Sequence, residues 1–213
     1  MKPHKEQFIA LALQERVLRF GSFKLKSGRE SPYFFDSGRF ASGRALSAVG
    51  QCYAAALHEL PIGFDMLFGP AYKGIALASA LAINVAPETN LPLAFNRKEA
   101  KDHGEGGHLI GSPLAGRVLI IDDVITAGTA VREAVALIRE AGATPVGVLT
   151  ALDRQERGPG GREAVVELSE GYGLVIRSVI TISDLIAYLL ARPESEHASR
   201  LSALEAYRAR YGA

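Results

Sequence analysis

The sequence predicts an α/β fold with a central, mainly parallel sheet flanked by helices. Two observations indicate this fold class. Short continuous runs of Val, Ile, Leu and Phe succeed one another along the chain, and helical segments separate most of them. Continuous apolar strands alternating with helices are typical of a parallel sheet covered on both faces. The length of 213 residues, 48% of them hydrophobic, allows a single domain with a substantial core.

The first part of the chain is predicted to contain two helices joined by a loop. Apolar residues recur at helical spacing from Phe8 to Leu18, and Gly21 ends that helix. A loop over residues 24–32 leads into the aromatic run 33–35. The second helix is expected from Ser42 to about Leu60, because its apolar residues gather on one side.

The sheet is predicted to lie in the middle and later parts of the chain. Its expected strands are Met66–Phe68, Leu93–Phe95, Val118–Ile121, Val146–Leu149 and Leu174–Ile180. Helices are expected at 75–83 and 131–141, and Ser183 and Ser199 are expected to begin two closing helices. In such folds ligands bind at the carboxyl ends of the strands.

Charge and cysteine content narrow the class of protein. Lys and Arg total 24 against 23 Asp and Glu, which argues against a disordered charged tail or a dedicated DNA-binding protein. Cys52 has no second cysteine for a disulfide, which fits a reducing compartment. The most apolar window, Gly74–Pro87, falls short of the ~18 residues that a membrane span needs. We therefore expect a cytoplasmic protein that binds neither membrane nor nucleic acid.

The segment from Val118 to Ala130 carries the sharpest chemical signal. An apolar strand ends in Asp122 and Asp123, and a loop of small residues then leads directly into a helix. Small residues leave backbone N–H groups accessible, and a helix N-terminus favours anions, so this loop is suited to a phosphate. The two acids cannot serve the same phosphate. They instead suit the hydroxyls of an attached sugar, or a divalent metal held through water.

Other phosphate motifs are absent from the sequence. There is no GxxxxGK[ST] run for a nucleoside triphosphate and no GxGxxG run for a dinucleotide. A plain structural interpretation is that the two acids cap a helix and that the loop is a tight turn. A cap needs one acid, however, and here two follow a very apolar strand.

Ile120–Ala130 resembles the phosphoribosyl-diphosphate (PRPP) motif of the type I phosphoribosyltransferases. Phe23–Phe35, Asn96–Gly107 and Leu152–Gly158 further resemble segments of the orotate phosphoribosyltransferases of the bacterial type. The resemblance implies the type I fold as a single domain over residues 1–213, with a small hood formed by residues 1–40 and the C-terminal segment. It also implies a homodimer with shared active sites.

The resemblance assigns site residues by position. PRPP contacts are implied for Lys26, Tyr72, Lys73, Arg97, Lys98, Lys101, His103, Asp122, Asp123, Val124, Ile125, Thr126, Ala127, Gly128, Thr129 and Ala130. Of these, Lys101, His103, Asp122 and Asp123 are implied to be catalytic. Orotate contacts are implied for Phe34, Phe35, Thr126 and Arg154.

Several of these residues have simpler interpretations that the sequence leaves open. Lys73 can be a solvated lysine, although a cation at a helix start opposes the helix dipole. The charged loop 96–107 can be a solvated loop, or one that closes over an anion. Phe34 and Phe35 can be core residues. Arg154 suits a carboxylate such as that of orotate, but Asp153 and Glu156 offer it a local ion pair.

The function implied by the resemblance is transfer of the 5-phosphoribosyl group from PRPP to N1 of orotate, in UMP biosynthesis. The products are orotidine 5'-monophosphate and diphosphate, and Mg²⁺ is expected to act mainly through PRPP and water, with no protein metal site. One alternative is a sister transferase with another base, for which Arg154 has no carboxylate partner. Another is a regulator that binds PRPP as a signal together with nucleic acid, although no basic patch supports it.

Overall fold

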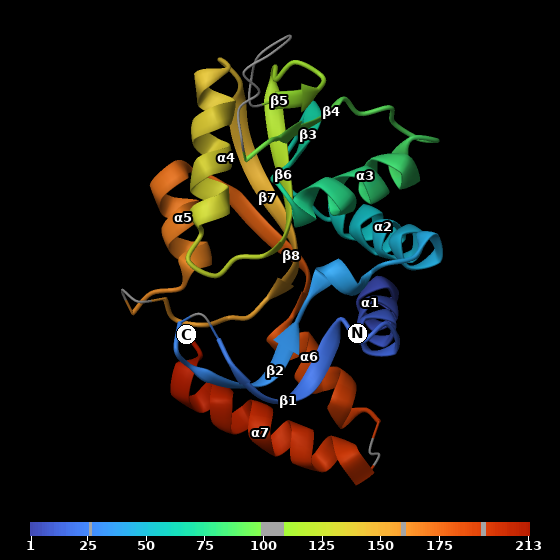
Figure 1. Ribbon diagram of the computed structural model, residues 1–213, viewed down its shortest axis with the longest axis vertical. Helices are drawn as coiled ribbons and strands as arrows, with labels where there is room; N and C mark the ends of the chain where they lie inside the picture. The colour runs from blue at the N-terminus through green and yellow to red at the C-terminus, as the bar shows by residue number, and fades with distance from the viewer. Residues whose placement is uncertain (26, 99–108, 159–160, 193–194) are drawn as a thin grey trace.

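A six-stranded sheet lies at the centre of the molecule, with helices on both faces (Figure 1). The computed structural model describes residues 1–25, 27–98, 109–158, 161–192 and 195–213, the side chains of 195 and 196 excepted. The strand order is β5-β4-β3-β6-β7-β8, and only the β4–β5 pair is antiparallel. The predicted fold class, a mainly parallel sheet flanked by helices, is confirmed.

Five strands of the central sheet match the predicted apolar runs, the central ones extend beyond them, and the edge strand β5 was not predicted. The strands of this sheet are β3 (Met66–Gly69), β4 (Leu93–Asn96), β5 (Leu109–Gly111), β6 (Arg117–Val124), β7 (Thr144–Asp153) and β8 (Val175–Thr181). The pleat divides their side chains between two apolar clusters. Leu119 and Ile121 pack on the side of α2 (Gly43–Leu57) and α3 (Lys73–Val85), whereas Ile120 packs toward α4 (Thr129–Glu140).

A second, two-stranded sheet lies at one end of the molecule. It pairs β1 (Leu18–Lys24) with β2 (Glu30–Phe35) antiparallel, and a short 3-10 turn, η1 (Ser37–Arg39), follows. The long helix α7 (Ser195–Tyr211) lies along this small sheet, and α1 (Pro3–Gln14) and α6 (Ile182–Leu190) complete that end (Figure 1).

The predicted extension of the first helix through Leu18 to Gly21 is wrong. The predicted first helix ends at Gln14, and Leu18 begins a strand whose register pairs it with Phe35. Helical spacing of Val17 and Leu18 is misleading because both are buried in the core without being helical. The unpredicted helix α5 (Ala164–Tyr172) follows the Gly-rich stretch 158–161.

Two helix starts also differ from expectation. The cap of α6 is Thr181, two residues before the expected Ser183, and Thr181 and Asp184 form a reciprocal capping box. Ser183 lies inside that helix, and its hydroxyl donates to Gln155 Oε1. α7 begins at Ser195, ahead of the expected Ser199. Among the residues described, no helix is long and apolar enough to span a membrane.

Close packing of α2 on α3 generates a stability prediction. A Cβ added at Gly50 of α2 would lie 2.4 Å from the carbonyl oxygen of Ala80 in α3. We expect Gly50→Ala to lower the free energy of unfolding by about 1–3 kcal/mol, because the two backbones must separate. Urea unfolding followed by circular dichroism measures this.

The matched control lies in the same helix. A Cβ at Gly43 meets no atom within 4 Å, so Gly43→Ala should leave the unfolding midpoint unchanged or slightly raised. Equal midpoints for the two variants would contradict the close approach of α2 and α3.

Candidate active site

The carboxyl ends of the neighbouring strands β3 and β6 bring a lysine and two acids together. Lys73, the first residue of α3, places Nζ 3.1 Å from Asp123 Oδ2 and 3.2 Å from Asp36 Oδ1. A Cβ at Gly74 would lie 2.7 Å from the carbonyl oxygen of Ile121, so only glycine allows α3 to start this close to β6. The cation at the helix start is therefore held by carboxylates from two other elements.

Of the two adjacent acids of β6, Asp122 and Asp123, Asp122 is the more buried. Only 8% of its surface is exposed, and its Oδ1 accepts a hydrogen bond from the backbone N–H of Asp123 at 2.9 Å. The Tyr53 hydroxyl of α2 donates to the carbonyl oxygen of Asp122 at 2.8 Å and fixes the strand end. Burial, with the nearby charge of Asp123, raises the pKa of the Asp122 carboxyl to about 7. A perturbed acid in a cluster of charges is a functional signal.

The segment between β3 and α3 faces the end of β4. The Ala71 backbone N–H donates to Asn96 Oδ1 at 2.7 Å, and the Ala71–Tyr72 peptide bond is cis. The Tyr72 side chain is exposed, and Lys98 Nζ lies 5.1 Å from the centre of its ring. Residues Tyr72, Lys73 and Lys98 are thus brought to the same end of the sheet.

The loop after β6 leaves a helix start open to an anion. Residues Thr126 and Ala127 are exposed, and Gly128 precedes α4 with a φ of 76°. Within the described part of the chain, no side chain caps the first turn of α4. Its backbone N–H groups are therefore available to an oxygen-rich ligand.

Arg154, directly after β7, has partners on several sides. Its side chain is 9% exposed, and its guanidinium carbon lies 4.3 Å from the centre of the Tyr33 ring. Nε donates to Glu156 Oε1 at 2.7 Å, and Nη2 donates to Ser31 Oγ at 3.2 Å and to the Tyr207 hydroxyl at 3.4 Å. The local ion pair with Glu156, left open by the sequence, is present. The long bonds of Nη2 are the ones that an incoming carboxylate can replace most easily.

Phe34 and Phe35 lie on opposite faces of β2. Phe35 is buried and stacks on Phe8 with ring centres 6.3 Å apart, so its side chain is part of the core. Phe34 is partly exposed beside Phe23, with the Arg19 guanidinium 5.4 Å from its ring centre. The Phe35 ring therefore offers a ligand little surface, and its contact with one would be through the backbone.

Three expected site residues, Lys26, Lys101 and His103, lie outside the described residues. Three groups beside the acids were not anticipated. These are Tyr53, Asp36 and Ser37, whose hydroxyl donates to Asp123 Oδ2 at 2.8 Å. A single serine or tyrosine forms no recognisable sequence pattern. These contacts arise only because the fold places η1 and α2 beside the end of β6.

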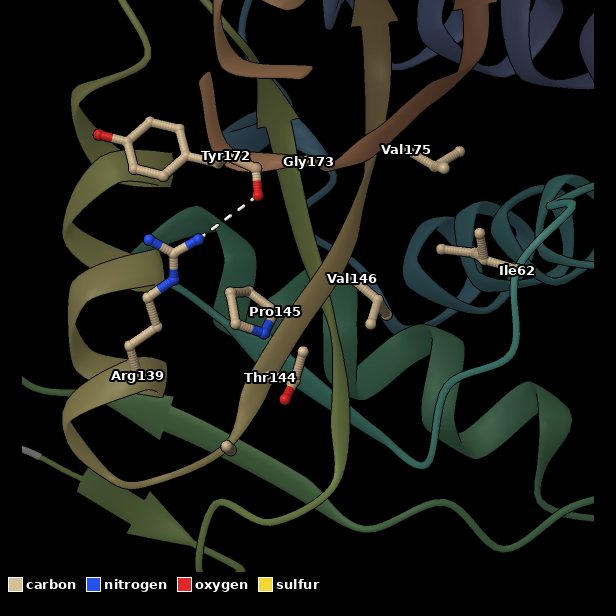
Figure 2. A pocket seen from close by; sticks show the side chains of 9 residues that line it. Ile62, Arg139, Thr144, Pro145, Val146, Tyr172, Gly173 and Val175 are labelled. Carbon is tan, nitrogen blue, oxygen red and sulfur yellow. Dashed lines mark hydrogen bonds between the residues drawn. The ribbon is translucent and has the colours of Figure 1, made fainter. Parts of the chain in front are cut away.

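One hollow among the described residues lies away from this site. A cavity of about 430 Å³ lies at the amino ends of β7 and β8, lined by residues that include Thr144, Pro145 and Val175 (Figure 2). Arg139 and Tyr172 border it, joined by a hydrogen bond from Nη2 to the Tyr172 carbonyl oxygen. The opposite edge of the sheet carries the charged residues, so this hollow is not part of the candidate site.

Comparisons with known proteins agree with this geometry. A family model described as the phosphoribosyl transferase domain matches residues 40–173. The orotate phosphoribosyltransferase of Cronobacter sakazakii is 55% identical over 214 residues, covering 100% of both chains. The crystal structure of the Francisella tularensis orotate phosphoribosyltransferase superposes with a TM-score of 0.85 at 35% identity, covering 97% of this chain and 99% of that one. A Mycobacterium tuberculosis orotate phosphoribosyltransferase in complex with PRPP superposes with a TM-score of 0.64 at 26% identity, over 86% and 99%.

The raised pKa of Asp122 generates a prediction about stability and pH. Its folded-state pKa of about 7 exceeds the ordinary value of 3.8, so the folded state binds a proton that the unfolded state has released. Stability therefore falls as pH rises from about 4 to about 7. We expect Asp122→Asn, which cannot ionise, to gain about 2 kcal/mol relative to wild type between pH 5 and pH 8. Urea unfolding of both proteins at the two pH values measures this gain; the same difference at both would contradict it.

Proposed function

The chain belongs to the phosphoribosyl transferase family and, within it, to the orotate phosphoribosyltransferases, and we propose that the charged cluster after β3 and β6 carries its reaction. The reaction transfers the 5-phosphoribosyl group of PRPP to N1 of orotate, giving orotidine 5'-monophosphate and diphosphate in pyrimidine biosynthesis. The observation that supports this location is the pairing of Asp122 and Asp123 with the uncapped start of α4.

In this proposal the two acids and the helix start hold the phosphoribosyl group. Asp122 and Asp123 bind the ribose hydroxyls, and their charge stabilises the cation-like C1 that develops as the diphosphate departs. Val124 to Ala130 surround the 5'-phosphate, with backbone N–H groups and the hydroxyls of Thr126 and Thr129 as donors. Lys73 releases Asp36 and Asp123 when phosphate oxygens become its partners.

Cations around the cluster neutralise the diphosphate. Tyr72 and Lys98 are already in contact with each other beside Lys73, and Arg97 precedes Lys98 in the chain. We include Lys26, Lys101 and His103 in the PRPP site on their family positions. A cation that contacts the diphosphate stabilises the transition state more than the ground state, because negative charge on the diphosphate increases as its bond to C1 breaks.

Arg154 is proposed to bind the orotate carboxylate. Its guanidinium is fixed by Glu156 and the Tyr33 ring, so it is oriented before the ligand arrives. Thr126 supplies a hydroxyl to the flat base, Phe34 supplies a ring contact, and Phe35 supplies a contact through its backbone. A uracil or purine base has no carboxylate, so these residues favour orotate over the bases of sister enzymes.

Mg²⁺ is proposed to enter with PRPP. In the described ranges, no group of three or more His, Cys, Asp or Glu side chains is arranged to hold a metal ion. The oxygens of Asp122 and Asp123 are the hard donors that Mg²⁺ prefers, and they fit an ion carried by PRPP and reached through water. When bound, Mg²⁺ would neutralise part of the diphosphate charge.

We propose a cytoplasmic homodimer in which the small sheet, α1 and the C-terminal helix form a hood over the site. Exposed apolar side chains support an interface. Tyr72 and Ile83 are 68% and 72% exposed at the start and in the body of α3, and Ile110 is 42% exposed on the edge strand β5. The buried, free thiol of Cys52 is compatible with a reducing compartment.

The activity test follows orotate absorbance with PRPP and Mg²⁺, in parallel with uracil, adenine and hypoxanthine. We expect orotate to be the only one of the four bases that is converted. We expect this conversion to stop when a chelator removes the metal. PRPP binding without consumption of orotate would favour a regulator, and turnover of another base would favour a sister enzyme.

Replacement of Arg154 tests the orotate site. We expect Arg154→Met to raise the KM for orotate by at least about 100-fold, because a charge-assisted bidentate contact is lost, and to change the KM for PRPP much less. Arg139→Met, at the far edge of the sheet, is the control and should leave both KM values unchanged. A normal orotate KM in Arg154→Met would remove Arg154 from the site.

Replacement of Lys101 tests the leaving-group site and its sharing between subunits. We expect Lys101→Ala to lower kcat by about 100-fold or more with an unchanged melting temperature. Refolding Lys101→Ala together with Arg154→Met should restore about a quarter of wild-type activity, since half the dimers then contain one intact site. No recovery would mean that Lys101 serves its own subunit, and near-normal turnover of Lys101→Ala alone would exclude its proposed role.

A further inference from the structure

The two oxygens of Asp123 are held by different parts of the molecule. Oδ1 accepts a hydrogen bond from the adjacent backbone N–H of Val124 at 2.8 Å. Oδ2 accepts from the Ser37 hydroxyl at 2.8 Å and lies 3.1 Å from Lys73 Nζ. The orientation of this carboxylate therefore depends on its own strand, on α3 and on the 3-10 turn η1 of the small sheet.

These two side-chain partners of Oδ2 differ in how firmly they are placed. Ser37 is 6% exposed, whereas the Lys73 side chain is 44% exposed and is shared with Asp36. A serine side chain has one rotatable bond to its hydroxyl, while a lysine has four along its stem. Ser37 is thus the rigid partner and Lys73 the movable one.

The turn that carries Ser37 is itself fixed. The Asp36 side chain accepts a hydrogen bond from the Gly38 N–H at 3.2 Å and so caps η1. Phe35 just before it and Phe40 just after it are both buried against Phe8. The hydroxyl is therefore delivered to Asp123 by a turn anchored in the core on both sides.

We propose that Ser37 is a positioning residue for the reaction: its hydroxyl keeps the Asp123 carboxylate aligned for the ribose of PRPP after Lys73 has turned to the phosphate oxygens. This inference rests on the proposed role of Asp123 in binding the ribose. A hydrogen bond to a carboxylate is about twice as strong as one between neutral groups, so one hydroxyl is sufficient to restrain the rotation of the carboxylate. The turn that follows the small sheet then contributes to the sugar site.

The test compares variants at Ser37 under steady-state conditions. We expect Ser37→Ala to lower kcat/KM for PRPP by about 10-fold, and to change the KM for orotate at saturating PRPP by less than about 2-fold. Ser37→Thr, which keeps the hydroxyl, should recover most of the loss. A role in folding alone would not separate the two substrates.

Ser42→Ala is the matched structural control. Ser42 lies in the same region and caps α2 by accepting from the Ala45 N–H at 3.2 Å, so its loss should lower stability while leaving kcat/KM for PRPP unchanged. Wild-type kcat/KM for PRPP in Ser37→Ala, or equal losses for both substrates together with a melting temperature as low as that of Ser42→Ala, would overturn the proposal.

Asp123→Asn separates this inference from the proposed function. If Asp123→Asn abolishes PRPP use and Ser37→Ala has no effect, the positioning role of Ser37 fails and the role of Asp123 stands. If Asp123→Asn itself keeps normal kcat/KM for PRPP, the proposed ribose contact fails and the inference fails with it.

Discussion

Parallel pairing of β3 with β6 is the constraint on which the site depends. Met66 lies opposite Val118 and Phe68 opposite Ile120, so both strands end at the same edge of the sheet. Asp122 and Asp123 lie near the carboxyl end of β6, and Lys73 follows β3, so Lys73 and Asp123 meet although they are far apart in sequence. Uncompensated charges are costly next to an apolar sheet, and the ion pairs among these residues reduce that cost. The same arrangement leaves Asp122 poorly solvated, which is why its pKa is raised.

The inner strands of the central sheet could be predicted from sequence because they are buried on both faces, whereas the more exposed edge strand β5 was not predicted. A continuous run such as Val118–Ile121 has few other stable placements, and the same holds for Met66–Phe68. The small sheet could not be predicted in this way. Leu18 is apolar at helical spacing from the first helix, and only pairing with the distant Phe35 makes it a strand. At Leu18 the pairing with a residue later in the chain therefore outweighs the local helical pattern.

In the candidate site, too, residues that are adjacent in the chain could be predicted, and partners from distant elements could not. Residues 122–130 could be predicted because two acids, small residues and a helix start are adjacent in the chain, and the resemblance to a family added the separate cations. The partners that orient these groups could not. Tyr53 reaches Asp122 from α2, and Tyr207 reaches Arg154 from α7. Neither tyrosine differs in sequence from an ordinary core residue. The pairing of Arg154 with Glu156 was one of two interpretations that the sequence left open, and the structure contains this ion pair.

The position of α7 along the small sheet has a consequence for how the protein is made. Residues near the start of the chain are held by residues near its end: Lys5 pairs with Asp184, 179 positions later, and the Tyr33 and Tyr207 rings meet edge to face at 6.2 Å. Such contacts raise the contact order and slow folding. During synthesis β1 and β2 emerge from the ribosome long before α7. Until α7 has been made, they lack the helix that packs against them. The binding site can be completed only after the last helix has been made, and an interrupted chain would expose the apolar side of this small sheet.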